Sequence, residues 1–188
     1  DSLPQLNIEG GEYVYFPVAI FQYGLGAWDL YLETQDEVYL KKFIQSADWA
    51  IHNQDEHGRW NNFFYIFPKT PYGAMAQGEG ASLLVRAYKH TGDIRYFEAA
   101  KRAIDYMLLP MQEGGVTEYD KEDVILREYT NQQTVMNGWI FAWWGLYDFV
   151  LVNNDVHKYS DLMNHSLVSL MFSSIIYSNV TRLLVSFM

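Results

Sequence analysis

Residues 84–108, LVRAYKHTGDIRYFEAAKRAIDYML, predict two helices joined by a short turn. The first helix is largely apolar, Thr91-Gly92-Asp93 forms the turn, and Ile94 to Leu109 is apolar on one side only. A helix that is apolar on most sides is buried, whereas a one-sided helix covers a core from outside. The stretch therefore predicts an αα-hairpin with an inner and an outer helix.

The same layout recurs at residues 29–51 and 146–167. Equivalent tyrosines stand 57 and 59 residues apart, and acidic turn residues and outer-helix aromatics also correspond. The three sets are Tyr31, Tyr88 and Tyr147; Asp36, Asp93 and Asp155; and Tyr39, Tyr96 and Tyr159. A period above 50 residues is typical of helical hairpin repeats, which bury their inner helices only by stacking.

These repeats predict an all-α fold, an incomplete α/α barrel (toroid) of stacked αα-hairpins. We expect an extended lead-in at 1–16 with a turn at Gly10-Gly11, the barrel domain at 17–171, and a divergent tail at 172–188. The expected helices are 18–34, 37–53, 72–90, 94–109, 135–152 and 156–171, with Asp36 capping the second. A scaffold of tetratricopeptide type is the alternative, but its repeats are shorter.

The loops at 52–71 and 110–134 both precede an inner helix. In a barrel such loops gather at one end of the ring, where they build a site. Loop residues on a rigid scaffold often serve binding.

The composition of the chain narrows the range of possible functions. The net charge of −10 argues against nucleic acid, whose phosphates need a basic surface. The chain has no cysteine, so disulfides and zinc–thiolate sites are excluded, and the histidines lack metal-ligand spacing. The aromatic fraction of 17% suits either core packing or a sugar-binding cleft. No segment before residue 166 is long and apolar enough to span a bilayer, and residues 166–188 contain six Ser and an Arg.

Three motifs resemble one known family. PYGAMAQGEGASLLVRAY (71–88), NGWIFAWWGLYD (137–148) and, less closely, PVAIFQYGLGAWDLYL (17–32) are similar to the C-terminal domain of D-glucuronyl C5-epimerases. The resemblance covers about residues 12–160. It implies an α/α barrel that inverts D-glucuronate to L-iduronate in a heparan-type polysaccharide, and an isomerase without a cofactor.

The family's catalytic Glu-Tyr pair falls on Glu128-Tyr129, with Thr130 where the family has Pro. Inversion at C5 removes a proton beside a carboxylate and needs a base on one face and an acid on the other. Tyrosine suits one face if its pKa is lowered, and glutamate suits the other if burial raises its pKa. The family's downstream tyrosine motifs have no counterpart after Ser166, so an inactive domain stays an alternative.

Further residues are candidates for binding substrate by their place in the loops or on inner helices. They are Arg127, Trp60, Asn62, Tyr72, Gln77, Glu79 and Asn137. Tyr147 and Asp148 recur with the fold, so core packing explains them better. No metal or cofactor is indicated.

Two other function classes remain open. A lyase shares the proton abstraction, whereas a hydrolase needs two carboxylates, for which Glu79 and Glu128 are the available pair. A non-catalytic glycan-binding domain is the third interpretation. The expected partner is a uronic-acid polysaccharide, and an apolar tail surface would favour a homodimer. The compartment remains open, with an extracytoplasmic location favoured.

Overall fold

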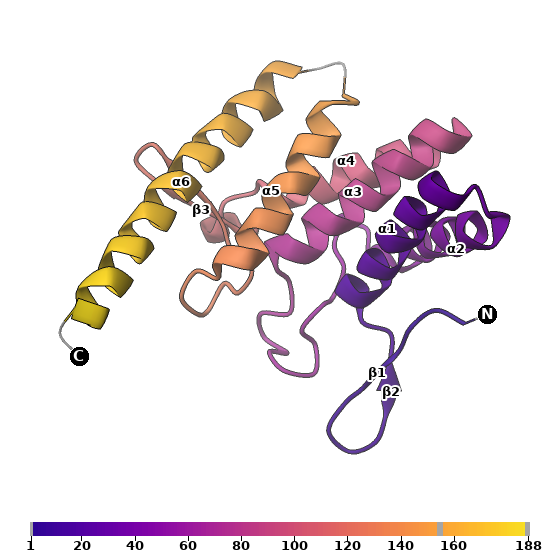
Figure 1. The fold of residues 1–188 in the computed structure, drawn as a ribbon, viewed down its shortest axis with the longest axis horizontal. Coiled ribbons are helices and arrows are strands. Elements are labelled where there is room, and N and C mark those ends of the chain that lie inside the picture. Colours follow the sequence, from indigo (N-terminus) through magenta and orange to yellow (C-terminus); the bar gives the residue numbers. More distant parts are fainter. Residues whose placement is uncertain (1, 154–155, 187–188) are drawn as a thin grey trace.

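The computed structural model describes residues 2–153 and 156–186 and is mostly helical (Figure 1). Successive helices pair: α1 packs on α2, α3 on α4, and α5 on α6. Their bounds are α1 Pro17–Thr34, α2 Glu37–Asn53, α3 Ala74–Thr91, α4 Ile94–Met107, α5 Met136–Val150 and α6 Val156–Ser186. The predicted all-α class is confirmed for the described residues, while closure into a barrel stays a prediction.

Helix α3 is the centre of the molecule, with α1 packed on one side and α5 on the other. Every residue from Ala74 to Val85 is buried, because helices or loops cover α3 on all sides over this stretch. The approach of α5 is close, since a Cβ at Gly78 would lie 2.5 Å from the Cα of Ala142. Small residues on α3 therefore let two inner helices meet backbone to backbone.

The repeat predicted from the sequence is visible in the contacts between outer helices. The Tyr96 hydroxyl of α4 donates to Asp48 of α2 at 2.7 Å, and the Tyr159 hydroxyl of α6 donates to Asp105 of α4 at 2.8 Å. Each hairpin is thus tied to the preceding one by an equivalent hydrogen bond. Such bonds fix the stacking because each tyrosine ring is buried.

The turns within the hairpins also follow the prediction. The Asp36 carboxylate accepts from the Val38 amide at 2.9 Å, and Asp93 accepts from the Arg95 amide at 3.0 Å. These are N-caps, which satisfy amides that have no partner within the helix. The third turn residue, Asp155, lies outside the described residues.

Two short β-hairpins accompany the helices. In the lead-in, β1 (Leu6–Asn7) pairs with β2 (Tyr13–Val14) around the predicted Gly10-Gly11 turn, and this hairpin projects from the helices (Figure 1). The second, β3 (Thr117–Asp120) with β4 (Asp123–Leu126), lies in a stretch that the sequence predicts only as a loop. Its turn places Lys121 at φ 55°, a conformation that the sequence does not signal.

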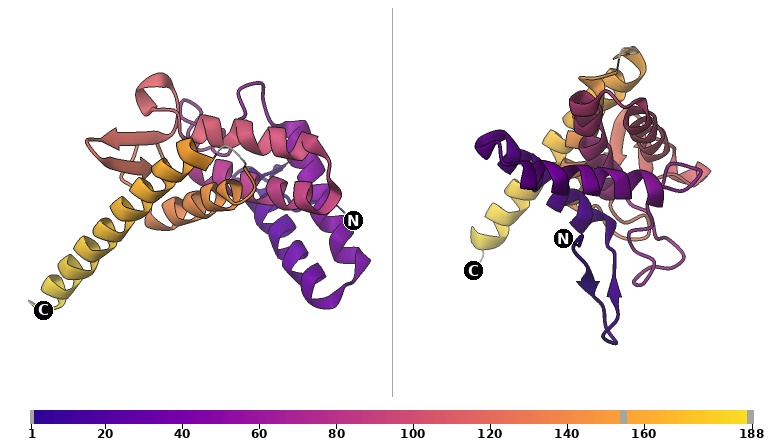
Figure 2. Two further views of the ribbon diagram at one scale, coloured as in Figure 1. Left: turned by 90° about the horizontal axis from the view of Figure 1, so that it is seen from above. Right: turned by 90° about the vertical axis from the view of Figure 1, so that its right-hand side faces the viewer.

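Helix α6 is longer than predicted. It continues past Met171 to Ser186, and its C-terminal part extends away from the other helices (Figure 2). Val168, Met171 and Phe172 are exposed on it. None of the helices in the described part of the chain is long and apolar enough to cross a membrane.

Candidate active site

The loop between β4 and α5 carries Glu128 into the gap between α3 and α5. The Ala74 amide at the start of α3 donates to the Arg127 carbonyl at 2.8 Å, which ties the loop to the inner helix. A Cβ at Gly138 would lie 2.7 Å from the Glu128 Cδ, so this glycine leaves room for the carboxyl group. The Glu128 side chain is therefore buried rather than free in solvent.

Glu79 of α3 is a second buried carboxyl group near the first. It is 3% exposed, and its Oε1 accepts from the Gln22 side chain of α1 at 3.0 Å. Burial raises its pKa to about 7, with the nearby charge of Glu128 acting in the same direction. The Oε2 atoms of both Glu79 and Glu128 are buried without a partner among the described residues. Two carboxyl groups thus share one poorly solvated region.

Tyr129 follows Glu128 in the loop, and the two side chains lie close enough for each to shift the pKa of the other. Its ring packs on Phe63 and Phe67, with centroids 4.7 and 5.7 Å away. Burial raises the pKa of Tyr129, and the Glu128 charge raises it further. Burial also raises the pKa of Glu128, although the tyrosine contact works against that effect. Tyr129 is therefore held as a protonated phenol, rather than as a phenolate.

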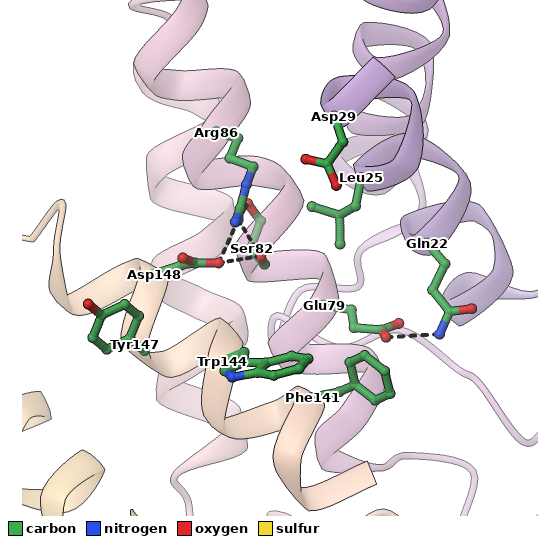
Figure 3. A pocket seen from close by; sticks show the side chains of 10 residues that line it. All are labelled: Gln22, Leu25, Asp29, Glu79, Ser82, Arg86, Phe141, Trp144, Tyr147 and Asp148. Carbon is green, nitrogen blue, oxygen red and sulfur yellow. Dashed lines mark hydrogen bonds and ion pairs between the residues drawn. The ribbon is translucent and has the colours of Figure 1, made fainter. Parts of the chain in front are cut away.

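A cavity of about 600 Å³ opens beside Glu79, between α1, α3 and α5 (Figure 3). Arg86 of α3 donates to the Asp148 carboxylate of α5 at 2.5 Å, and the Ser82 hydroxyl donates to the same carboxylate at 2.5 Å. The remaining lining residues are Gln22, Leu25, Asp29, Phe141, Trp144 and Tyr147. The cavity thus combines aromatic rings with paired and unpaired polar groups.

Two candidates from the first long loop lie inside the protein. Trp60 has no exposed surface, and its indole N–H donates to the Ala50 carbonyl at 2.8 Å. Asn62 is 1% exposed, and its Oδ1 accepts from the Val18 amide at 3.3 Å. In this structure both residues attach the loop to α1 and α2, and Trp60 presents no ring face to a ligand.

The other candidates are spread over several places. Gln77 is fully buried on α3, with both amide atoms unpaired among the described residues. The Arg59 guanidinium carbon lies over the Tyr72 ring, 4.3 Å from the ring centroid. Tyr72 lines a separate cavity of about 400 Å³. Asn137 is exposed on the first turn of α5.

Arg127 anchors its own loop. It pairs with Glu118 at 3.1 Å, donates to the Thr134 hydroxyl at 2.6 Å, and also donates to the Gln132 carbonyl. Its side chain lines a cavity of about 510 Å³ together with Trp139 of α5. Among the sequence candidates, the structure therefore brings together Glu79, Glu128 and Tyr129.

Of the residues that line the cavity between α1, α3 and α5, only Glu79 is a candidate from the sequence, and three of the others stand out. Trp144 and Tyr147 are 52% and 41% exposed, and Asp148 pairs with Arg86 in the cavity wall. The repeat predicts that Tyr147 and Asp148 pack in the core. In the structure they line the cavity instead, so this prediction is corrected. The available signal is the i, i+3 and i+4 spacing from Trp144, which puts all three on one face of α5.

Comparison with known proteins identifies the family. The family model described as "D-glucuronyl C5-epimerase C-terminus" matches residues 54–179. The chain belongs to this family. A D-glucuronyl C5-epimerase from Caenorhabditis elegans is 32% identical over 122 residues, which are 60% of this chain and 20% of that relative. The chain thus matches about a fifth of the length of this C5-epimerase, and the region matched by the family model includes Glu79, Glu128 and Tyr129.

Proposed function

We propose that this chain is a uronate C5-epimerase domain that inverts D-glucuronate to L-iduronate within an acidic polysaccharide. Membership of the C5-epimerase family supports this activity. The observation that carries it is the buried Glu128 carboxyl group, beside the half-buried Tyr129 and near Glu79, with carboxyl oxygens on both glutamates that lack protein partners among the described residues. We also propose that the stacked hairpins form part of an α/α barrel whose concave side receives the polymer.

In this proposal Glu128 is the base. Its carboxylate removes the proton from C5, and the electron pair left on carbon delocalises into the substrate carboxylate as an enediolate. A raised pKa makes the ionised Glu128 a stronger base than an ordinary glutamate carboxylate. Tyr129 is the acid, because its raised pKa keeps the phenol protonated until it gives its proton to the other face of C5.

The contact between the two side chains resets the site. After inversion Glu128 carries the proton taken from substrate, and Tyr129 is left as a phenolate. Because the two groups lie close enough to shift each other's pKa, we propose that the proton passes from Glu128 to Tyr129, directly or through water, and restores the starting state. One proton is removed and one supplied in each turnover, so no cofactor is consumed.

The buried amide of Gln77 and the Glu79 carboxyl are the proposed substrate contacts next to this pair. Both have atoms without a partner among the described residues, and such buried groups gain most from a ligand hydrogen bond. We propose Asn137, Tyr72 and Arg127 as outer contacts for a long polymer, because each lies at or near the surface.

Deuterium incorporation tests the function. The chain is incubated in D₂O with heparosan, an unsulfated glucuronate polymer, and NMR follows the C5 position and the chain length. Epimerisation predicts deuterium at C5, new L-iduronate signals and unchanged chain length. Unsaturated ends would instead indicate a lyase, and cleavage without unsaturation a hydrolase. Polymer binding with no exchange at any pH would contradict the proposal and leave a glycan-binding domain.

Two variants test the assignments within the pair. Glu128→Gln and Tyr129→Phe keep size but remove the proton-transfer groups, and each should slow exchange by about 10²-fold or more. Glu33→Gln and Tyr13→Phe, on exposed parts of the molecule, are the matched controls and should keep full exchange. Full exchange in either site variant would remove that residue from the mechanism.

A further inference from the structure

Helix α6 has one side packed on the molecule and one side open to solvent. On the packed side, Ser166 is fully buried, and its hydroxyl accepts from the Trp139 indole N–H of α5 at 2.9 Å. The Met163 carbonyl accepts from the Trp143 indole N–H at 2.9 Å. These contacts fix which side of α6 faces the solvent.

The open side of α6 carries three exposed apolar side chains. Val168, Met171 and Phe172 are 51%, 57% and 63% exposed. Their i, i+3 and i+4 spacing makes them neighbours on the helix surface, and we call them the α6 stripe. Exposed apolar side chains that lie together favour association or aggregation unless another group covers them.

Asn164 lies on the same side of α6, one turn before the stripe. It is exposed, and its side chain makes no hydrogen bond with the described residues. Around the helix axis, Val168 and Met171 lie only about 40° and 20° from Asn164, since successive residues are about 100° apart. A group attached to Asn164 would therefore lie beside these apolar side chains.

Asn164-His165-Ser166 has the pattern Asn-X-Ser, where X is not Pro, which marks an acceptor for N-linked glycans. The transferase needs the Ser hydroxyl, yet Ser166 is buried in the folded chain. Glycan transfer must therefore come before α6 packs on α5, as it does when transfer takes place during synthesis. Because Asn164 remains exposed, the fold has room for the glycan outside the protein.

We propose that Asn164 carries an N-linked glycan that covers the α6 stripe. The C–H faces and acetyl groups of the first N-acetylglucosamine units suit contact with apolar side chains, while their hydroxyls face water. N-linked glycans are bulky and make a surface more soluble. The modification goes beyond the proposed function and does not depend on it.

The chemistry is a group transfer without oxidation or reduction. The Asn164 side-chain nitrogen forms a bond to C1 of the first sugar and loses one proton. The bond between C1 and the diphosphate of a lipid-linked oligosaccharide breaks, and the lipid diphosphate leaves. The step requires passage through the secretory pathway, in line with the extracytoplasmic location expected from the sequence.

Glycan transfer is tested by expressing the whole chain behind a cleavable secretion signal in insect cells. Enzymatic release of N-linked glycans in H₂¹⁸O converts each glycosylated asparagine to an ¹⁸O-labelled aspartate, which mass spectrometry of peptide fragments locates. We expect the label at Asn164. Fragment ions distinguish it from the second match to the pattern, Asn179-Val180-Thr181. An unlabelled Asn164 in both the cell and the medium fraction would overturn the proposal.

A pair of variants checks the site by gel migration. Asn164→Gln should remove one glycan, and its exposed position means that the fold should be kept. Asn131→Gln is the matched control, because Asn131 is exposed but is followed two residues later by Gln133 rather than by Ser or Thr. It should leave the number of glycans unchanged. An Asn164→Gln chain that migrates like the wild type would contradict the assignment.

The covering role is measured by binding of the apolar dye 1-anilinonaphthalene-8-sulfonate to the purified chain. Asn164→Gln should bind more dye than the wild type, and adding Met171→Ser should remove most of this increase. Enzymatic removal of glycans from the wild-type chain should raise dye binding in the same way, so the test does not depend on secretion of the variant. Equal dye binding with and without the glycan would contradict the covering role. Self-association of the glycosylated chain that Met171→Ser abolishes would instead assign the stripe to a second copy and overturn it.

Discussion

Replacement of Glu79 by glutamine should make the stability of the protein less sensitive to pH. Folding raises the pKa of Glu79 from 4.5 to about 7, because the charged carboxylate is poorly solvated between α1, α3 and α5. The folded state therefore binds more protons than the unfolded state between these two values. It follows that the contribution of this group to stability is greatest below pH 4.5, falls as the pH rises towards 7, and stays lower above it.

The size of the effect follows from the two pKa values. Each pKa unit corresponds to about 1.4 kcal/mol, so the wild-type protein should lose up to about 3 kcal/mol through this one group. The glutamine of the variant cannot ionise, and its amide oxygen can still accept from the Gln22 side chain. For a chain of this length, about 3 kcal/mol corresponds to a Tm difference of about 6–12 °C.

The assay is thermal unfolding followed by circular dichroism at pH 5 and pH 8.5, for the wild type and Glu79→Gln. Any loss of packing in the variant is the same at both pH values, so the difference between the two Tm changes isolates the ionisation. We expect the variant to gain about 6–12 °C relative to wild type between pH 5 and pH 8.5. Glu33→Gln on the exposed side of α1 should show no such gain. A Tm change of Glu79→Gln that is equal at both pH values would refute the reasoning.

Two further predictions concern the scaffold. Gly78→Val places a branched side chain where α3 meets Ala142 of α5, so the free energy of unfolding in urea should fall by about 1–3 kcal/mol or more. Gly26→Ala, at an open position on α1, is the control and should be tolerated. Asp36→Ala removes the cap of α2 and should lower the free energy of unfolding by about 1 kcal/mol. Asp36→Asn keeps an accepting oxygen and should retain most of the wild-type stability. Equal losses in both variants would contradict the capping role.

The hairpin repeat could be predicted from the sequence because each of its elements has a local signal. Asp36 and Asp93 each cap a helix by accepting from the amide two residues later, and the 57-residue spacing of Tyr31 and Tyr88 marks the period. The β3–β4 hairpin lacks such signals. Its strands have four residues each, and its turn at Lys121 uses a positive φ without the usual Gly or Asn.

The site was only partly predictable because burial depends on contacts far along the chain. Trp60 occurs in a polar loop, which favours an exposed ring, yet it packs against Phe21 with centroids 4.9 Å apart, 39 residues earlier in sequence. Trp144 occurs in an apolar helix, which favours burial, yet its side of α5 faces the cavity. A periodic pattern tells which faces are apolar, but not which of them another element covers.

The glycines and alanines of α3 link the stability of the fold to its chemistry. Gly78 lets α5 approach so closely that water is excluded from the helix contact, and Glu79 stands next to it in the same turn. The exclusion of water that raises the pKa of Glu79 is thus produced by the packing that holds the inner helices together. A substitution that loosens this crossing should therefore lower the pKa of Glu79 towards 4.5 as it destabilises the protein. In a series of larger residues at position 78, the pKa of Glu79 and the free energy of unfolding should fall in proportion. A loss of stability with an unchanged pKa of Glu79 would contradict this link.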